Sequence, residues 1–159
     1  MFAAVCWADI LGAQTPAPQL AWLDAAAAAE IKAIAAEIIP ETDTPGADRA
    51  GVIWFIDRAL AGYDRDKQDL YTRGLRETQL RRAEMFPGSI SIERLSPARR
   101  IELLQAVETT EFFRQVRFHT ILGYFGHPMH GGNRDMAGWK MLGLEHSMQY
   151  APPFGSYDK

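Results

Sequence analysis

The chain has 159 residues, of which 47% are hydrophobic and 23% charged; this is an ordinary soluble globular composition, and it excludes a largely disordered chain. The formal net charge of −3 gives no electrostatic argument for a nucleic-acid partner. The single cysteine, Cys6, excludes an internal disulfide and a zinc site of four thiolates, and it leaves either a small buried side chain or an intersubunit disulfide.

The first 19 residues are mostly apolar up to position 13 and faintly resemble the end of a secretory signal. However, no basic region precedes the apolar run, and Asp9 interrupts it. The run is also too short to span a bilayer. We therefore interpret this segment as part of the folded subunit, or as the remainder of a longer leader.

Helical periodicity dominates the following hundred residues. The first helix is predicted between Asp24, which can cap its N-terminus, and Pro40, which ends it. Four further helices are predicted over the ranges 47–63, 64–86, 95–108 and 109–123. The start signals are Asp64 or Asp66 for the third helix, Ser96 with Pro97 for the fourth and a threonine cap for the fifth.

No alternating apolar pattern with hairpin turns indicates a sheet. The sequence therefore predicts a single all-α domain over residues 1–159, built as a bundle of about five helices. In this prediction, the helical scaffold spans about residues 20–123. A long irregular segment rich in Gly, Pro and aromatic residues follows over about residues 124–159, with one short helical turn around 134–142.

The irregular C-terminal segment carries too many large apolar side chains to remain solvated. It also holds 7 of the 13 glycines, counted from Gly123, and 3 of the 4 histidines. Ordering such a segment costs conformational entropy that only packing can offset. We expect it to pack either on its own bundle or on another subunit.

The two histidines of this segment, His127 and His130, raise the possibility of a metal site together with Asp135 and, as further ligands, His119 or His146. A small metal- or ligand-binding enzyme that uses His127, His130 and Asp135 is therefore one hypothesis. Against it, neither a H-E-x-x-H pattern nor a cysteine partner accompanies the histidines. His119 follows Phe112 by one heptad, which favours a hydrogen-bonded core histidine.

Other chemistry is less well supported by the sequence. The stretch "HGGNRD" follows a helix instead of a strand and lacks both glycine-rich phosphate-binding patterns. No G-x-S-x-G motif occurs, and Cys6 has no evident histidine partner. We therefore expect no catalytic, cofactor or metal site in this chain.

A docking surface is the interpretation that we favour, because Tyr, Trp and Arg are enriched in protein interfaces. The planar guanidinium of Arg134 suits bidentate pairing with a carboxylate or with backbone carbonyls of a partner. The predicted contacts are Tyr124, His127, His130, Gly131, Gly132, Asn133, Arg134, Asp135 and Trp139.

Two stretches of the sequence resemble a known family. "AAEIIPETDTPGADRAGVIWFID" (35–57) resembles the opening of the gluconate 2-dehydrogenase subunit 3 family. "GYFGHPMHGGNRDMAGWKMLG" (123–143) resembles its C-terminal signature, and "YAPPFGSYD" (150–158) fits as well. The resemblance covers residues of about 20–158.

The resemblance implies a small subunit that carries no cofactor of its own. In this family, FAD and the catalytic histidine belong to a large subunit of the GMC oxidoreductase type, which acts on sugars or sugar acids. A cytochrome c subunit often takes the electrons, so haem c, or an iron–sulfur cluster, is expected only elsewhere in the complex. The small subunit is thought to support folding and Tat-dependent export, which places the complex in the periplasm, at the inner membrane through its partner subunits.

Three features depart from the family pattern. His130 stands where an aromatic residue, usually tyrosine, is expected. No twin-arginine leader is visible, so export would depend on residues outside this chain or on the partner. Some members of the family have an intersubunit disulfide, and a single sequence does not establish that Cys6 forms it.

Overall fold

The computed structural model describes residues 19–144 of the chain, and it is all-α over that range, as the sequence predicts. The long helices are α1 (Ala25–Ile38), α2 (Val52–Ala61), α3 (Gln68–Met85), α4 (Pro97–Val107) and α5 (Glu111–Phe125). A short helix, α6 (Ala137–Met141), follows at the turn predicted around 134–142. Three 3₁₀ turns complete the described part: η2 (Arg65–Lys67), η3 (Pro128–His130) and η4 (Arg134–Met136).

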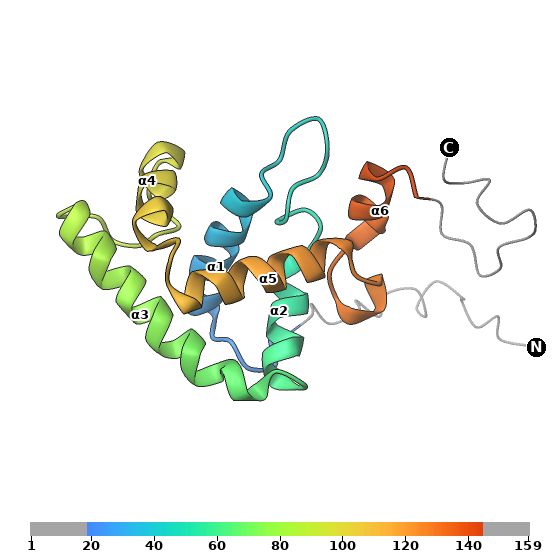
Figure 1. The fold of residues 1–159 in the computed structure, drawn as a ribbon, viewed down its shortest axis with the longest axis horizontal. Coiled ribbons are helices and arrows are strands. Elements are labelled where there is room, and N and C mark those ends of the chain that lie inside the picture. Colours follow the sequence, from blue (N-terminus) through green and yellow to red (C-terminus); the bar gives the residue numbers. More distant parts are fainter. Residues whose placement is uncertain (1–18, 145–159) are drawn as a thin grey trace, which may run out of the picture.

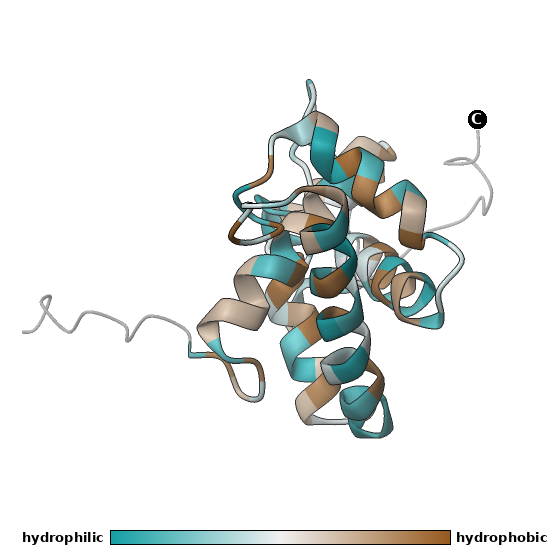
Figure 2. Ribbon diagram, turned by 90° about the vertical axis from the view of Figure 1, so that its left-hand side faces the viewer, coloured by the Kyte–Doolittle hydropathy of each residue, from teal (hydrophilic) through white to brown (hydrophobic). Residues whose placement is uncertain are grey.

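Helix α5 is the central element of the fold. It packs against α1, α2 and α3, while α4 packs against α1 and α3. In Figure 1, α3 and α4 lie at one end of α5 and α6 lies at the other. Hydrophobic and hydrophilic residues alternate along the ribbons in Figure 2, as in amphipathic helices that bury one face.

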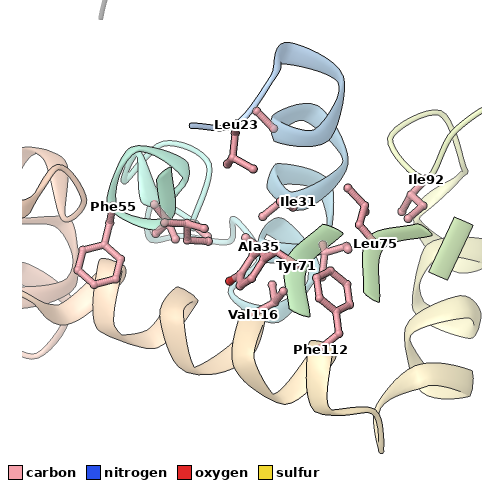
Figure 3. Close-up of a cluster of buried hydrophobic side chains, with 14 of the residues drawn as sticks. Leu23, Ile31, Ala35, Phe55, Tyr71, Leu75, Ile92, Phe112 and Val116 are labelled. Atoms are coloured by element: carbon pink, nitrogen blue, oxygen red, sulfur yellow. The ribbon is translucent and has the colours of Figure 1, made fainter. Parts of the chain in front are cut away.

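The core between α3 and α5 depends on a close approach of the two helices. Tyr71 and Phe112 meet edge to face, with ring centroids 5.5 Å apart, and Figure 3 shows both beside Val116. A Cβ atom at Gly74 would lie 2.3 Å from the Phe112 side chain. Glycine at this position therefore allows the aromatic ring to pack directly on the backbone of α3.

Local sequence signals fix some helix starts, and tertiary contacts override others. Asp24 accepts a hydrogen bond from the Ala27 amide at 2.7 Å, and Thr110 accepts one from the Phe113 amide at 3.2 Å, as predicted caps should. Ser96 occupies the N-cap of α4, but its side chain makes no cap hydrogen bond. Helix α2 begins at Val52, later than predicted, because Gly51 at its N-cap adopts a left-handed conformation with φ 70°.

Asp57 ties the segment before α1 to α2. Its carboxylate is buried and accepts backbone hydrogen bonds from Ala21 at 2.6 Å, Trp22 at 3.0 Å and Leu23 at 2.9 Å. Three amide donors therefore converge on one buried anion, which compensates the loss of its hydration.

His119 is a core residue, as the sequence analysis expected. Its ring is fully buried: Nδ1 lies 2.9 Å from the Tyr71 hydroxyl and Nε2 lies 2.9 Å from Asp64 Oδ2. Since a carboxylate has no proton to donate, Nε2 carries the proton and Nδ1 accepts from Tyr71. The Asp64 carboxylate thus binds the buried His119 ring, and it makes no cap hydrogen bond at η2.

The stability of the fold should therefore decrease in mild acid through His119. Burial lowers its pKa below the ordinary histidine value of 6.5, against the opposing hydrogen bond and attraction of Asp64. The neutral ring contributes stability above the pKa of the unfolded chain, and this contribution is lost as pH falls through the folded pKa. We expect the free energy of unfolding to fall below pH 6.5, with a slope of at most about 1.4 kcal/mol per pH unit from this group.

Chemical denaturation between pH 5 and 7.5 measures this slope, with His119→Gln and the exposed His130→Gln as the pair of variants. The slope should be smaller in His119→Gln than in the wild type and in His130→Gln. An equal slope in all three proteins would contradict the assignment.

Candidate partner-docking site

The loop between α5 and α6, residues 126–136, is held against α2. The Arg134 amide donates to the Ala50 carbonyl at 3.0 Å, just before α2. On α2 itself, Arg58 Nη1 donates to the Met129 carbonyl at 3.2 Å. These contacts join segments more than 70 residues apart in sequence. The loop is therefore a tertiary element of the subunit.

Two glycines, one in the loop and one in α6, allow both segments to lie directly on the backbone of α5. A Cβ atom at Gly132 would lie 2.1 Å from the Gly123 carbonyl oxygen, and one at Gly138 would lie 2.2 Å from the Tyr124 carbonyl oxygen. Both contacts are with backbone, which cannot rotate away as a side chain can. The "GGNRD" and "GWK" motifs thus contain glycine because two backbones meet there.

Asn133 joins the end of α5 to the start of α6. The residue is fully buried, its Nδ2 donates to the Gly126 carbonyl at 2.8 Å, and its Oδ1 accepts from the Gly138 amide at 2.8 Å. It thus satisfies a carbonyl at one helix end and an amide in the first turn of the next helix. Its φ of 48° lies in the left-handed region, which asparagine tolerates better than most residues.

Aromatic side chains and His127 fix the loop and α6 to neighbouring segments. Trp139 Nε1 donates to the Phe125 carbonyl at 2.7 Å, and its ring meets the His127 ring edge to face at 5.5 Å. Tyr124 is fully buried, and its hydroxyl donates to the Pro45 carbonyl in the segment before α2. His127 Nδ1 in turn accepts from the Met129 amide at 3.2 Å. Contacts with the chain's own backbone and rings therefore fix the loop and α6.

Arg134 is the exposed centre of the loop. Its guanidinium lies over the Trp54 ring, 5.6 Å from the centroid, which is a cation–π arrangement. Its stem crosses Gly51, where a Cβ atom would lie 2.6 Å from Arg134 Nε. Within residues 19–144 the guanidinium forms no salt bridge. A positioned charge without a paired carboxylate is well suited to bind an anionic group.

The backbone of the loop is strained at three positions. Asn133, Asp135 and Met136 have φ values of 48°, 56° and 57°, and they are the non-glycine residues with positive φ among those described. Such conformations cost free energy and persist where surrounding contacts impose them, often at functional sites.

The predicted contact residues fall into three groups by their exposure. Tyr124, Gly132 and Asn133 are buried inside this chain, and the side chains of Tyr124 and Asn133 bind the chain's own backbone. Their role as direct partner contacts stays a prediction. Gly131 and Trp139 are half-buried. The exposed members of the predicted set are His127, His130, Arg134 and Asp135.

The structure adds neighbours that the sequence analysis missed. Trp54 lies under Arg134, while Arg49 and Lys140 line the same hollow as Arg134 and Asp135. Trp54 lies within the first stretch that resembles the family (35–57), and Lys140 lies within the second (123–143). This position in the two stretches was the sequence signal that could have identified them. Their proximity depends on the packing of the loop against α2, which no local pattern reveals.

Metal binding by His127, His130 and Asp135 is not supported by the geometry. Within residues 19–144, no group of three or more His, Cys, Asp or Glu side chains comes together in a way that could hold a metal ion. His119 is engaged with Tyr71 and Asp64 in the core. Cys6 and His146 lie outside the described residues.

Large apolar side chains are also exposed around the loop. They are Met129, Met136, Met141, Leu142 and Leu144. Methionine adapts its shape to a partner surface because its chain is unbranched and flexible.

None of the helices in the described range 19–144 is long and apolar enough to cross a membrane.

The fold and this loop define a small all-α protein that carries a rigidly fixed, partly apolar surface at one end of its scaffold. A family model described as gluconate 2-dehydrogenase subunit 3 matches residues 24–145, and the chain belongs to this family. The proteins of this family are thus subunits of a dehydrogenase complex. No curated protein and no solved structure matches the chain.

Proposed function

We propose that this chain is the non-catalytic small subunit that binds and stabilises a GMC-type, FAD-dependent sugar or sugar-acid dehydrogenase. It also assists maturation and export of that large subunit. FAD belongs to the large subunit in this proposal, and a cytochrome c subunit accepts the electrons. The complex resides in the periplasm, attached to the inner membrane through its partner subunits.

The observation that carries the proposal is the way the loop 126–136 is built. Its buried groups, led by Asn133, bind the ends of α5 and α6, and this leaves exposed groups such as His130 and Arg134 in fixed positions. A pre-ordered surface loses little conformational entropy when it binds. The exposed methionines and leucines beside it supply apolar area. Membership of a dehydrogenase-subunit family points to the partner.

Coexpression with a GMC-type dehydrogenase large subunit from the same genome tests the proposal. We expect the two chains to copurify in a fixed ratio, and we expect the yield of FAD-loaded large subunit to fall when the small subunit is left out. Elution of this chain alone, as a stable monomer, would refute the proposal. Elemental analysis of the same preparation tests the alternative of a metal enzyme, which requires stoichiometric metal bound to this chain.

A further inference from the structure

A cationic hollow of about 310 Å³ lies between the segment leading into α2 and the residues around α6. Three cationic side chains and one carboxylate line it: Arg49, Arg134, Lys140 and Asp135. The other residues around it are Thr44, Pro45, Ala137 and Met141. Since the whole chain has a net charge of −3, this excess of positive charge is local and opposite in sign to the chain as a whole.

Two of the three cations have no anionic partner among the described residues. Arg49 pairs with Glu41 at 2.8 Å, and both side chains are largely exposed. Neither Arg134 nor Lys140 forms a salt bridge within residues 19–144. A carboxylate that enters the hollow would therefore meet two cations that have no salt bridge, with Asp135 as the one carboxylate of the lining. The lining keeps an excess of positive charge, and electrostatic complementarity of this kind favours association.

Arg134 is held in place before any ligand arrives. Its amide is bonded to Ala50, its stem lies across Gly51, and its guanidinium rests over Trp54. A long side chain normally loses rotamer entropy when it is immobilised at an interface. Here much of that loss has already occurred during folding.

A second hollow, of about 350 Å³, shares Arg134 as part of its wall. Its lining is mainly apolar and comprises Leu20, Ala25, Ala28, Ala29, Ile53 and Trp54. Its two charged residues besides Arg134, Lys32 and Asp48, neutralise each other in a salt bridge of 3.0 Å. Thus Arg134 separates a cationic hollow from an apolar one.

We propose that the two hollows together receive one segment of the dehydrogenase partner. A carboxylate side chain of that segment pairs with Arg134 and Lys140, and a neighbouring apolar side chain packs beside Trp54. A free phosphate would occupy only the cationic hollow, whereas a peptide segment uses both. The identity of the occupant rests on the proposed function, and the chemistry of the hollows rests on the side chains that line them.

The affinity of the purified two-chain complex tests the pairing. Arg134→Met keeps an unbranched apolar stem across Gly51 and removes the charge over Trp54; we expect the Kd to rise about 30-fold or more. Lys140→Met should raise it less, about three- to tenfold, because an ammonium pairs as a single point charge. The matched control is Arg73→Met, which removes an exposed arginine of α3 that pairs with Asp69 at 3.1 Å. It should change the Kd by less than about twofold.

The affinity of the wild-type complex should also weaken with added salt more steeply than that of the double variant Arg134→Met/Lys140→Met. Thermal unfolding of each isolated variant checks that the fold is retained. If the complex forms and both single variants bind within about twofold of the wild type, the proposed pairing is wrong.

Titrations of the isolated full chain separate this proposal from the proposed function. The two probes are a hexapeptide of alternating glutamate and leucine, and inorganic phosphate. Nuclear magnetic resonance follows the Arg134 Nε–H and Trp54 indole signals. The peptide should shift both signals, and phosphate should shift only that of Arg134.

Equal shifts of both signals with phosphate would show a small-anion site and overturn the docking of a segment. Absence of any shift with the peptide would also overturn the docking of a segment. If no complex forms with the dehydrogenase, the proposed function and the named occupant fail together. The peptide titration then still decides whether the hollows bind an acidic, partly apolar segment.

Discussion

Replacing Asn133 by alanine is expected to lower the free energy of unfolding by about 3 to 4 kcal/mol. The substitution removes two hydrogen bonds of 2.8 Å and leaves the Gly126 carbonyl and the Gly138 amide without their partner. An orphaned buried polar group costs about 1 to 3 kcal/mol, which is more than the net contribution of the hydrogen bond itself. Alanine also pays about 1 kcal/mol for the left-handed backbone.

Two further variants separate these contributions. Asn133→Gly removes the same hydrogen bonds but adopts φ 48° without steric cost, so it should be more stable than Asn133→Ala by about 1 kcal/mol. Asn133→Asp keeps the acceptor for Gly138 and places a carboxylate against the Gly126 carbonyl. Urea denaturation gives the free energies. A loss below about 0.5 kcal/mol in Asn133→Ala would show that the loop does not depend on this side chain.

Asn133 also provides a direct spectroscopic readout, because it is the only asparagine in the chain. Its side-chain amide protons should exchange slowly with solvent, since Nδ2 is bonded to Gly126 inside the subunit. The loop carries the proposed docking surface, so Asn133→Ala should also weaken the complex with the dehydrogenase. Arg134→Met, in contrast, should weaken the complex without a comparable loss of stability.

The sequence predicted the fold class and helix order because the helical period and the turn residues are local signals. Asp24 and Thr110 cap the helices that they were predicted to cap. Asp64 shows the limit of such signals, since its carboxylate binds His119 on α5 instead of a helix terminus. A competing partner 55 residues away is set by tertiary packing and leaves no local trace.

The site was predictable as a segment, but the direction of its side chains was not. The glycines and polar residues of 126–136 indicate a shaped loop, yet the same residue types serve the inside and the outside of a turn. Asn133 faces inward because helix ends expose backbone groups that must be satisfied. Trp54 and Arg49 join the surface only because the loop packs against the start of α2, a contact between distant parts of the chain.

Asp57→Ala is the second substitution for which we expect a large effect, a loss of about 3 kcal/mol in the free energy of unfolding. Its carboxylate accepts from three backbone amides, those of Ala21, Trp22 and Leu23, and the Leu23 bond is buried. Hydrogen bonds to a charged group contribute about 1.5 to 3 kcal/mol each. Water can replace the bond at the exposed Ala21, which keeps the total below the sum of three.

The variant Asp57→Asn tests whether charge or shape anchors the segment. Its amide oxygen can still accept, but its Nδ2–H group faces backbone donors, so we expect a loss of about 2 kcal/mol. Asp24→Ala is the matched control: it removes an exposed helix cap, with an expected cost of about 1 kcal/mol. If Asp57→Ala costs no more than Asp24→Ala, the buried carboxylate is not an anchor.

Asp57 also links stability to the proposed docking surface. The residue adjoining the anchored segment, Leu20, lines the apolar hollow together with Trp54 and Arg134. Loosening residues 21–23 should therefore disturb the apolar hollow and leave the cationic one unchanged. Hydrogen exchange of the Ala21, Trp22 and Leu23 amides should accelerate in Asp57→Asn. In the peptide titration, the response of the Trp54 indole should then weaken while that of Arg134 persists, because only the apolar half of the surface depends on Asp57.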